Sequence, residues 1–434
     1  MAHIQIPDEV PVRYLPRSSR ANLFWGGLVA VGLLAFVLTL VRNPMQAWRA
    51  YVADWLLFAS VSMGALILAA ATTITKAKWS WSVRRVFMSP AAFLPLAFVL
   101  FLPMLTLGAD WFPWIEEMAH DPILQNKAAY LNFPFLVARN VILVLLLFGI
   151  ALYFTYLGLR PDLGLASGEH EGGDEARRAW RARLTADWAG QEREEVRSWQ
   201  RMKRLAPALV LVYAVAMTFI SYDWAMTLEP HWFSTMFGPW FFMGAFWGGV
   251  ATIALITIYL KRADRECDRL MGAQQLHDLG KLAFAFCVFW AYLFFAQYLV
   301  IWYGKLPWEQ AWIVHRSEPP WGAWSAAVVV LCFVLPFAGL LGRRPKTSPK
   351  ILGTFSVVIL AGLWLERYLL VAPSLEVDAP PMTVWEPLIG LMFLGLFGWS
   401  VRWFLSTFPV VQVWQPPAEA EMVEAEVRDE AGVA

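Results

Sequence analysis

The stretch YLNFPFLVARNVILVLLLFGIALYFTYLGL, residues 130–159, decides the fold class of this chain. It contains one charged side chain, Arg139, among residues that are almost all apolar. A helix of about 20 apolar residues crosses the hydrocarbon core of a bilayer. The stretch exceeds that length, so it predicts a transmembrane helix that is tilted or that protrudes from the bilayer.

Nine further stretches have the same character. The chain has 434 residues, of which 59% are hydrophobic and 16% are charged, and its mean hydropathy is +0.50. A soluble domain is about 25% charged, so this composition excludes a disordered protein and most soluble enzymes. The sequence predicts an all-α polytopic membrane protein. Its ten transmembrane helices are expected at 22–42, 49–76, 86–108, 130–159, 205–227, 237–260, 277–303, 322–342, 350–372 and 384–407.

The basic residues predict the orientation, because loops rich in Lys and Arg stay in the cytoplasm. With the N-terminus inside, the inner segments hold 27 Lys and Arg and the outer loops hold 5. Both termini are therefore expected to be cytoplasmic, and the first span is expected to be retained rather than cleaved as a signal peptide. The chain then divides into an N-terminal segment 1–21, spans 1–4 in 22–159, a charged insert 160–204, spans 5–10 in 205–407 and an acidic tail 408–434.

The insert carries ten Lys and Arg and nine Asp and Glu. Its part from Asp174 to Arg204 contains no proline and has three tryptophans spaced along it. This pattern predicts an amphipathic helix on the cytoplasmic side, which either docks on a partner or the membrane interface or serves as a solvated linker. The net charge of +1 gives no sign of a nucleic-acid partner.

The chain has few side chains that could hold a redox cofactor. Its six histidines fall in loops, tails or span ends, so no pair is placed to hold a haem inside the bilayer. Its three cysteines are isolated, which gives neither a haem attachment motif nor a ligand set for an iron–sulfur cluster. We therefore expect this chain to bind no redox cofactor and no metal.

Charged residues within spans are costly and are candidates for function. Most of them are predicted to lie toward the outer face, and Lys281 lies at the inner end of its span. They suggest a hydrated cavity that opens outward and handles protons, or ion pairs that only hold helices together. Asp54 and Glu386 are the two acids nearest the water interface, and for them snorkelling or helix capping is the alternative. The outward group is Asp54, Arg139, Asp223, Glu366, Arg367 and Glu386.

The outer loop between spans 5 and 6 adds Glu229 and His231 at the membrane edge. A metal site there is weakly indicated, because Pro230 separates the two side chains and no third ligand is evident. A docking surface or a proton exit is the stronger interpretation of this loop.

Residues 223–238, DWAMTLEPHWFSTMFG, resemble the signature of the ActF-type membrane subunit of alternative complex III, a member of the NrfD/PsrC-like family. Such complexes pass electrons from quinol to cytochrome c or to an oxidase. The resemblance covers most of residues 50–410. Three more stretches carry it: LGKLAFAFCVFWAYLFFAQYLVIWYGKLPWEQAW at 279–312, ERYLLVAPSL at 366–375 and VWEPLIGLMFLGLFGW at 384–399.

The resemblance implies two four-helix bundles, formed by spans 2–5 and 6–9, with spans 1 and 10 peripheral. It implies a place in a bacterial cytoplasmic (inner) membrane, among lipids. The implied partners are a homologous quinol-binding membrane subunit, an iron–sulfur subunit and c-type cytochrome subunits. Quinol or menaquinol, haem c and iron–sulfur clusters would be bound by those partners, and this chain would not be catalytic alone. Lys281, Asp223, Glu366 and Arg367 fit the family pattern.

Two departures from the family pattern are visible: Val86–Met88 follow the Arg84–Arg85 pair where an acid is common, and Glu309 stands alone where paired acids are common. The leading hypothesis is a subunit that handles protons and supports its quinol-oxidising sister subunit. A purely structural subunit and a stand-alone secondary transporter are the alternatives.

Overall fold

The structure is a computed structural model that describes residues 6–7, 9–166, 174–376 and 382–416. In this part of the chain, ten helices or helical segments are long and apolar enough to cross a membrane, and no strand occurs. The chain is thus an all-α, multi-pass membrane protein, as its hydropathy predicts. Each of the ten segments overlaps one of the ten predicted spans.

Eight of the spans are each built on one long helix, and the other two are interrupted. The long helices are α1 (Ser19–Arg42), α2 (Pro44–Ile74), α7 (Phe133–Leu165), α9 (Gln191–Trp224), α10 (Phe237–Ala263), α12 (Ala273–Gly304), α17 (Pro349–Leu375) and α18 (Trp385–Thr407). The short ones are α3 (Arg84–Met88), α4 (Leu94–Phe101), α5 (Trp114–Glu117), α6 (Pro122–Asn126), α8 (Glu175–Leu184), α11 (Arg265–Leu270), α13 (Pro307–Ser317), α14 (Gly322–Val329), α15 (Leu335–Gly339) and α16 (Arg343–Thr347).

Span 3 and span 8 are the two interrupted crossings. Span 3 runs from α3 through 3₁₀ turns at Ser89–Phe93 and Leu102–Thr106, on either side of α4. Prolines begin each of these pieces, and a proline removes a backbone hydrogen bond from a continuous helix. Span 8 consists of α14, a π-helical turn at Val330–Val334 and α15, which has Pro336 in its first turn.

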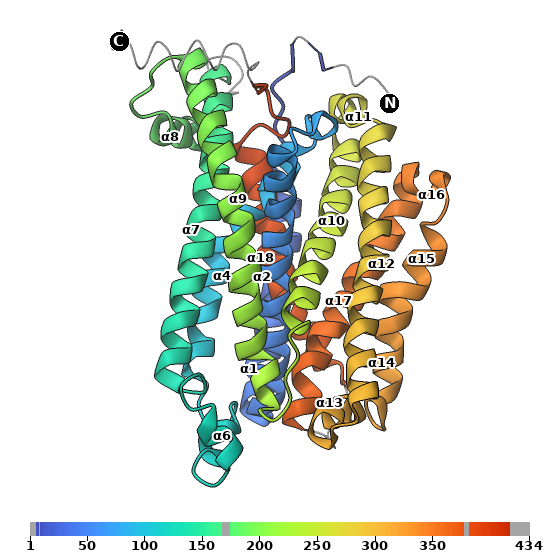
Figure 1. The fold of residues 1–434 in the computed structure, drawn as a ribbon. Coiled ribbons are helices and arrows are strands. Elements are labelled where there is room, and N and C mark those ends of the chain that lie inside the picture. Colours follow the sequence, from blue (N-terminus) through green and yellow to red (C-terminus); the bar gives the residue numbers. More distant parts are fainter. Residues whose placement is uncertain (1–5, 8, 167–173, 377–381, 417–434) are drawn as a thin grey trace.

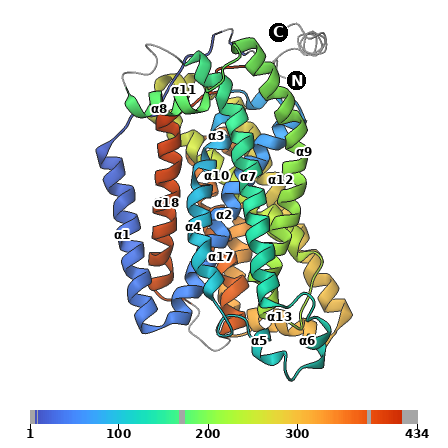
Figure 2. The same cartoon turned by 90° about the vertical axis from the view of Figure 1, so that its left-hand side faces the viewer.

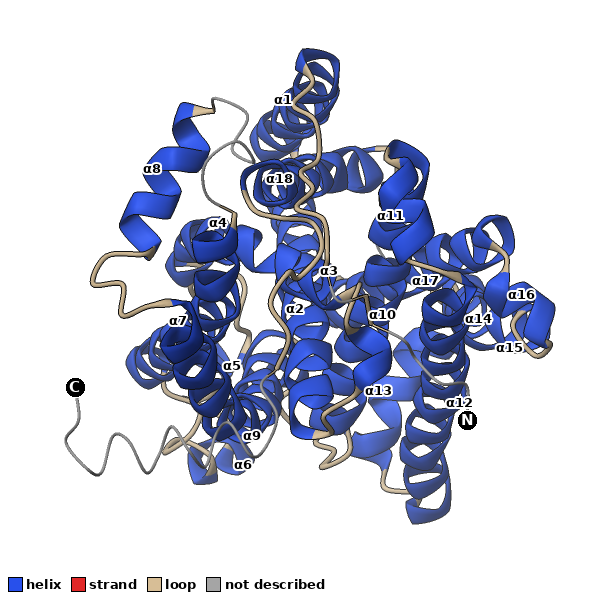
Figure 3. Ribbon diagram, turned by 90° about the horizontal axis from the view of Figure 1, so that it is seen from above, coloured by secondary structure: helices blue, strands red, loops and turns tan. Residues whose placement is uncertain are grey.

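Eight of the ten spans divide into two four-helix groups, which meet where α2 packs against α10. One group contains α2, α3–α4, α7 and α9, and the other contains α10, α12, α14–α15 and α17. Helices α1 and α18 pack against each other as a separate pair beside α2 (Figures 2 and 3).

Helices α2 and α10 join the two groups through small residues. A Cβ atom on Gly64 would lie 2.2 Å from the backbone oxygen of Ala245, and one on Gly249 would lie 2.3 Å from the backbone nitrogen of Ala65. The two helix backbones can approach this closely only because glycine stands at both positions. Close contacts between small residues are a common way for membrane helices to associate, since burial of apolar surface gives little driving force in lipid.

The ends of the bundle differ in the segments that cover them (Figure 1). Helices α8, α11 and α16 lie at one end, which we call the inner end because its loops hold most of the basic residues. Helices α5, α6 and α13 lie at the opposite end, here called the outer end (Figure 2). The cytoplasmic position of the inner end remains a prediction from the distribution of charge.

The charged insert differs from its prediction. Helix α7 continues to Leu165 and α9 already begins at Gln191, so much of 160–204 extends the neighbouring spans. The proline-free stretch from Asp174 is not one helix, because the chain turns between α8 and α9. Asp187 and Gly190 have positive φ there, at 58° and 102°, and Gly190 precedes the first residue of α9. Residues 167–173 lie outside the described part of the chain.

The first residues of the acidic tail are also not free in solvent. Phe408, Val411 and Trp414 are buried at the inner end, and the backbone N–H of Val410 donates to the carbonyl of Arg13 at 2.8 Å. Residues 408–416 therefore belong to the folded body, because their large apolar side chains pack against it. The acidic residues of the tail, from 417 onward, lie outside the described part.

Candidate functional site

Asp223 is the centre of a fully buried polar cluster between α7 and α9. Arg139 donates to both carboxylate oxygens, with Nε 2.7 Å from Oδ2 and Nη2 2.5 Å from Oδ1. Asn140 donates to Oδ2 at 2.6 Å, and the Tyr130 hydroxyl donates to Oδ1 at 2.9 Å. Four donors thus satisfy the carboxylate, which is what a buried charge within a membrane helix needs.

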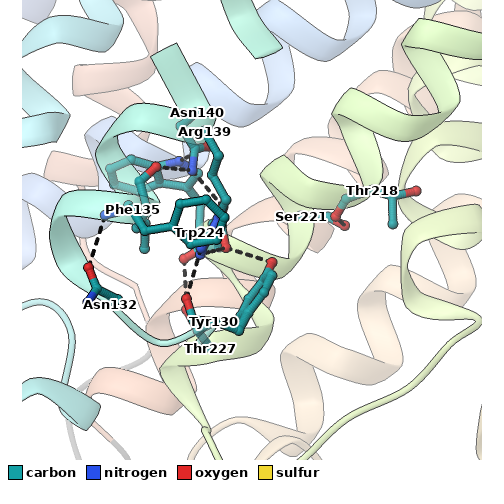
Figure 4. A network of polar contacts seen from close by, with 11 residues as sticks. Tyr130, Asn132, Phe135, Arg139, Asn140, Thr218, Ser221, Trp224 and Thr227 are labelled. Atoms are coloured by element: carbon teal, nitrogen blue, oxygen red, sulfur yellow. Dashed lines mark hydrogen bonds and ion pairs between the residues drawn. The ribbon is translucent and has the colours of Figure 1, made fainter. Parts of the chain in front are cut away.

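The local sequence positions these donors at the outer end of α7. Asn132 caps the helix by accepting from the backbone N–H of Phe135, and Arg139 and Asn140 follow two turns later (Figure 4). The guanidinium of Arg139 also lies over the Tyr130 ring, 4.0 Å from its centroid. The carbonyl of Asn140 accepts from the Trp224 indole at 3.1 Å. Each polar group of the cluster therefore has a partner on a neighbouring element.

A second buried cluster lies on α17, in the other four-helix group. The carboxylate of Glu366 pairs with the guanidinium of Arg367 and accepts the indole N–H of Trp290 at 2.8 Å. Arg367 also donates to the carbonyl of Phe241 at 3.0 Å, and its guanidinium lies 3.8 Å from the centre of the Phe241 ring. Both charged side chains are about 2% exposed or less.

Glu366 borders a cavity of about 480 Å³, whereas Asp223 does not. The cavity lies between α10, α12, α13, α14 and α17, and it is mostly apolar. The indole N–H of Trp240, which lines it, is buried and donates to no group in the described part of the chain. The aromatic residues that line it are Trp240, Phe294, Phe295, Tyr298 and Trp312, and the other polar ones are Gln297, Arg316, Ser317, Ser325 and Glu366. An apolar cavity with a few polar groups is the usual form of a small-molecule site.

The outward group is not a single constellation. Arg139 pairs with Asp223, Arg367 pairs with Glu366, and the two pairs belong to different four-helix groups. Both pairs lie toward the outer end, since Arg139 is near the outer start of α7 and Glu366 is past the midpoint of α17. Asp223 and Glu366 therefore belong to two separate sites and do not share one proton path.

Asp54 and Glu386 lie beside α17 near the outer end. The Trp364 indole donates to Oδ1 of Asp54 at 2.8 Å, while Oδ2 has no partner among the described residues. Glu386 accepts from the backbone N–H of Thr383 at 2.8 Å and from its hydroxyl at 2.7 Å. Both bonds run from Thr383 to Glu386, and the Thr383 hydroxyl in turn accepts the backbone N–H of Trp385 at 3.2 Å. Glu386 thus holds the backbone just before the start of α18, as the acid of a capping box does. Gln46 donates to the same carboxylate at 2.8 Å.

Glu229 and His231 have different partners at the outer surface. Glu229 accepts from Arg316 at 2.9 Å and from the Ser374 hydroxyl at 2.7 Å. Burial raises the pKa of Glu229, but the Arg316 guanidinium and these hydrogen bonds outweigh it, so its pKa lies below its ordinary value. His231 instead contacts Asp121, with 2.5 Å between Nε2 and Oδ2. These partners tie the outer loops together.

Lys281 is separate from all of these acids. It lies near the inner start of α12, where its ammonium group is 2.5 Å from the carboxylate of Asp278, one turn away. Its side chain is 53% exposed. A surface ion pair of this kind contributes little to stability.

Two buried ion pairs at the inner end are not predicted by the sequence pattern. Asp162 pairs with Arg85, and both side chains are fully buried. Arg160 donates to Glu194 twice, at 2.6 and 2.9 Å. Lys281 is thus not the only charged residue at the inner ends of the spans, because Arg85, Arg160 and Asp162 lie within the helical segments Arg84–Thr106 and Phe133–Leu165. Arg160 and Asp162 directly follow the apolar run that ends at 159, and hydropathy places them in the insert because charged residues end an apolar window.

The Arg85–Asp162 pair also holds the C-terminal segment. The second oxygen of Asp162 accepts the backbone N–H groups of Val413 and Trp414 at 2.8 and 2.9 Å. The Trp414 indole donates to the carbonyl of Gly158 at 3.0 Å. A buried carboxylate thus links α3, α7 and the end of the described chain.

The sequence matches no protein-family model, and a search of curated proteins found no relative at a significant level. The class of the protein therefore rests on its fold.

Proposed function

We propose that this chain is an integral subunit of a bacterial quinol-oxidising electron-transfer complex of the alternative complex III type. It would bind no redox cofactor itself. Quinol, haem c and iron–sulfur clusters would be bound by a homologous membrane subunit, c-type cytochrome subunits and an iron–sulfur subunit. Within the complex, this chain would handle protons and support its quinol-oxidising sister subunit in the bacterial inner membrane.

The observation that carries the proton role is the position of Glu366. Its carboxylate is buried within a membrane helix and borders a cavity. Ionisable residues inside spans are costly and often mark proton or substrate paths. Arg367 is placed to compensate the charge of Glu366 when the carboxylate is ionised. A water in the cavity could exchange a proton with this carboxylate and hydrogen bond to the free indole N–H of Trp240.

Asp223 supports the scaffolding part of the proposal. Four donors from Arg139, Asn140 and Tyr130 surround its carboxylate, and the cavity does not reach it. Because the Asp223 carboxylate already accepts four hydrogen bonds, it has no free lone pair that could accept a proton from a proton path. We therefore assign proton handling to Glu366 and helix positioning to Asp223.

Copurification tests the membership in a complex. The tagged chain is extracted from its native membrane in a mild detergent, and the absorbance of c-type haem in the purified sample is measured. The proposal expects haem-containing and iron–sulfur partners at a fixed ratio to this chain. A chain that purifies alone, without haem absorbance, would favour a stand-alone transporter.

A purely structural subunit is the second candidate function. The four hydrogen bonds that the Asp223 carboxylate accepts favour it. The two candidates differ in the behaviour of Glu366→Gln. In a structural subunit, this change lowers the yield of the complex but leaves the turnover of each assembled complex unchanged. In the proton-handling subunit, the complex assembles and proton release during turnover decreases.

A further inference from the structure

A long apolar groove of about 1000 Å³ lies on the opposite side of α17 from the cavity beside Glu366. Its walls come from α1 and α18 on one side and from α10 and α17 on the other, and α2 contributes its floor. Apolar side chains on these walls are exposed in the folded chain. Phe24 is 58% exposed, Val357 is 55% exposed and Leu394 is 40% exposed. The groove therefore opens toward the hydrocarbon core of the bilayer.

The inner end of this groove is positively charged. Arg20, in the first turn of α1, and Arg402, near the end of α18, both line it. No Asp or Glu is among the described residues that line the groove. Helix α1 begins and α18 ends at the inner end, so the two guanidinium groups belong to the same end of the groove.

Arg402 is a buried cation that has no acidic partner among the described residues. Its side chain is 8% exposed, and its two terminal nitrogens donate to the Tyr259 hydroxyl and the carbonyl of Pro16, each at 2.6 Å. In the described part of the chain, no carboxylate forms an ion pair with it. Most of the other buried arginines in the spans have an acid beside them, namely Arg49, Arg85, Arg139, Arg160 and Arg367. Arg84 has no acidic partner among the described residues and lies over the Trp199 ring instead, whereas Arg402 lines an open groove. A buried charge without a counter-charge is costly, so the fold favours an anion at this place.

We propose that the groove binds one anionic phospholipid of the inner leaflet. Its phosphodiester would lie at Arg20 and Arg402, and one acyl chain would run along the groove. Basic pockets between transmembrane helices on the cytoplasmic side bind the head groups of anionic lipids in this way. From Arg402 to Leu391, α18 extends about 16 Å at 1.5 Å per residue. That length matches the ~15 Å of one leaflet of the hydrocarbon core.

The site would join α1 to the body of the protein. Helix α1 packs closely on α18, but across the groove it faces α10 and α17. A lipid held there fills the space between these helices and neutralises Arg402. It would thus act as a structural component of the subunit.

Competitive lipid exchange followed by native mass spectrometry tests this proposal. The full chain, in the assembly in which it purifies, is exchanged in detergent against an equimolar mixture of phosphatidylglycerol and phosphatidylcholine. We expect one retained phosphatidylglycerol, because the choline group carries a positive charge that the arginines repel. Arg402→Gln should lower the preference for phosphatidylglycerol about tenfold, while Arg402→Lys should keep it.

Two further variants keep the test decisive if Arg402→Gln does not fold. Ala361 is an exposed residue in the apolar wall, so Ala361→Trp should fill the groove and displace the lipid while the arginines remain. Lys350 is an exposed cation at the inner end that does not line the groove, so Lys350→Gln is the matched control and should behave as wild type. Equal retention of both lipids by wild type, or unchanged retention in Arg402→Gln and Ala361→Trp, would overturn the proposal.

Discussion

Arg139 on α7 donates two hydrogen bonds, of 2.7 and 2.5 Å, to the carboxylate of Asp223 on α9. This geometry is the strong, bidentate form of an arginine–carboxylate pair. Because both side chains are buried, each depends on the other for its counter-charge. The pair therefore fixes the relative position of the two helices at the outer end.

Asp223→Asn should lower the stability of the folded chain by roughly 3 kcal/mol, because it leaves the Arg139 charge buried without a partner. Thermal denaturation of the purified chain in detergent measures this loss. The double variant Arg139→Leu/Asp223→Leu should recover part of the stability, since it removes both charges. A single variant as stable as wild type would contradict the assigned role of the pair.

Gly64→Val should disrupt the contact between the two four-helix groups, since its first side-chain carbon would lie 2.2 Å from the Ala245 carbonyl oxygen. Overpacking of a tight interface costs about 1–3 kcal/mol and more where the backbone must move. The yield of monodisperse protein in size-exclusion chromatography is the measurement. Gly149→Ala is the matched control, because its Cβ would meet nothing within 4 Å. Equal yields from both variants would be inconsistent with this contact.

The ion pair of Glu229 predicts a loss of stability in acid. Its pKa in the folded chain lies below the ordinary value of 4.5, so the pair contributes fully above pH 4.5. As the pH falls below 4.5 and through the lowered pKa, protonation removes that contribution. Glu229→Gln should be less stable than wild type at neutral pH, and the difference should shrink in this acidic window. Thermal denaturation across the pH range measures both. A constant difference between the two proteins would argue against the pair.

The contact of Asp162 with the C-terminal segment predicts protection from proteolysis. Asp162→Ala removes the acceptor for the N–H groups of Val413 and Trp414. Chymotrypsin should then cleave after Trp414 several-fold faster, which mass spectrometry of the fragments would detect. Asp268→Ala serves as the control, because Asp268 is a largely exposed acid at the same end of the bundle. Cleavage rates that match wild type in both variants would show that Asp162 does not hold the segment.

The ten spans could be predicted from the sequence because hydropathy over about 20 residues reports burial in lipid directly. Their ends could not, because Arg160 and Asp162 find buried partners on other elements and so continue α7 beyond the apolar run. The sequence also could not predict which acid of the outward group pairs with which arginine. Asp223 and Glu366 could each have joined either arginine, and only the packing of the two four-helix groups separates them.

The central claim is that Glu366 exchanges protons during turnover of a quinol-oxidising complex. The most direct test is the rate of proton release per assembled complex during quinol oxidation in sealed vesicles, for wild type and Glu366→Gln. The exposed acid Glu318 at the outer end provides the control variant Glu318→Gln. We predict that Glu366→Gln assembles but releases protons at a rate at least about tenfold lower, as expected for loss of a proton-transferring group. Unchanged proton release from a fully assembled Glu366→Gln complex would contradict the account.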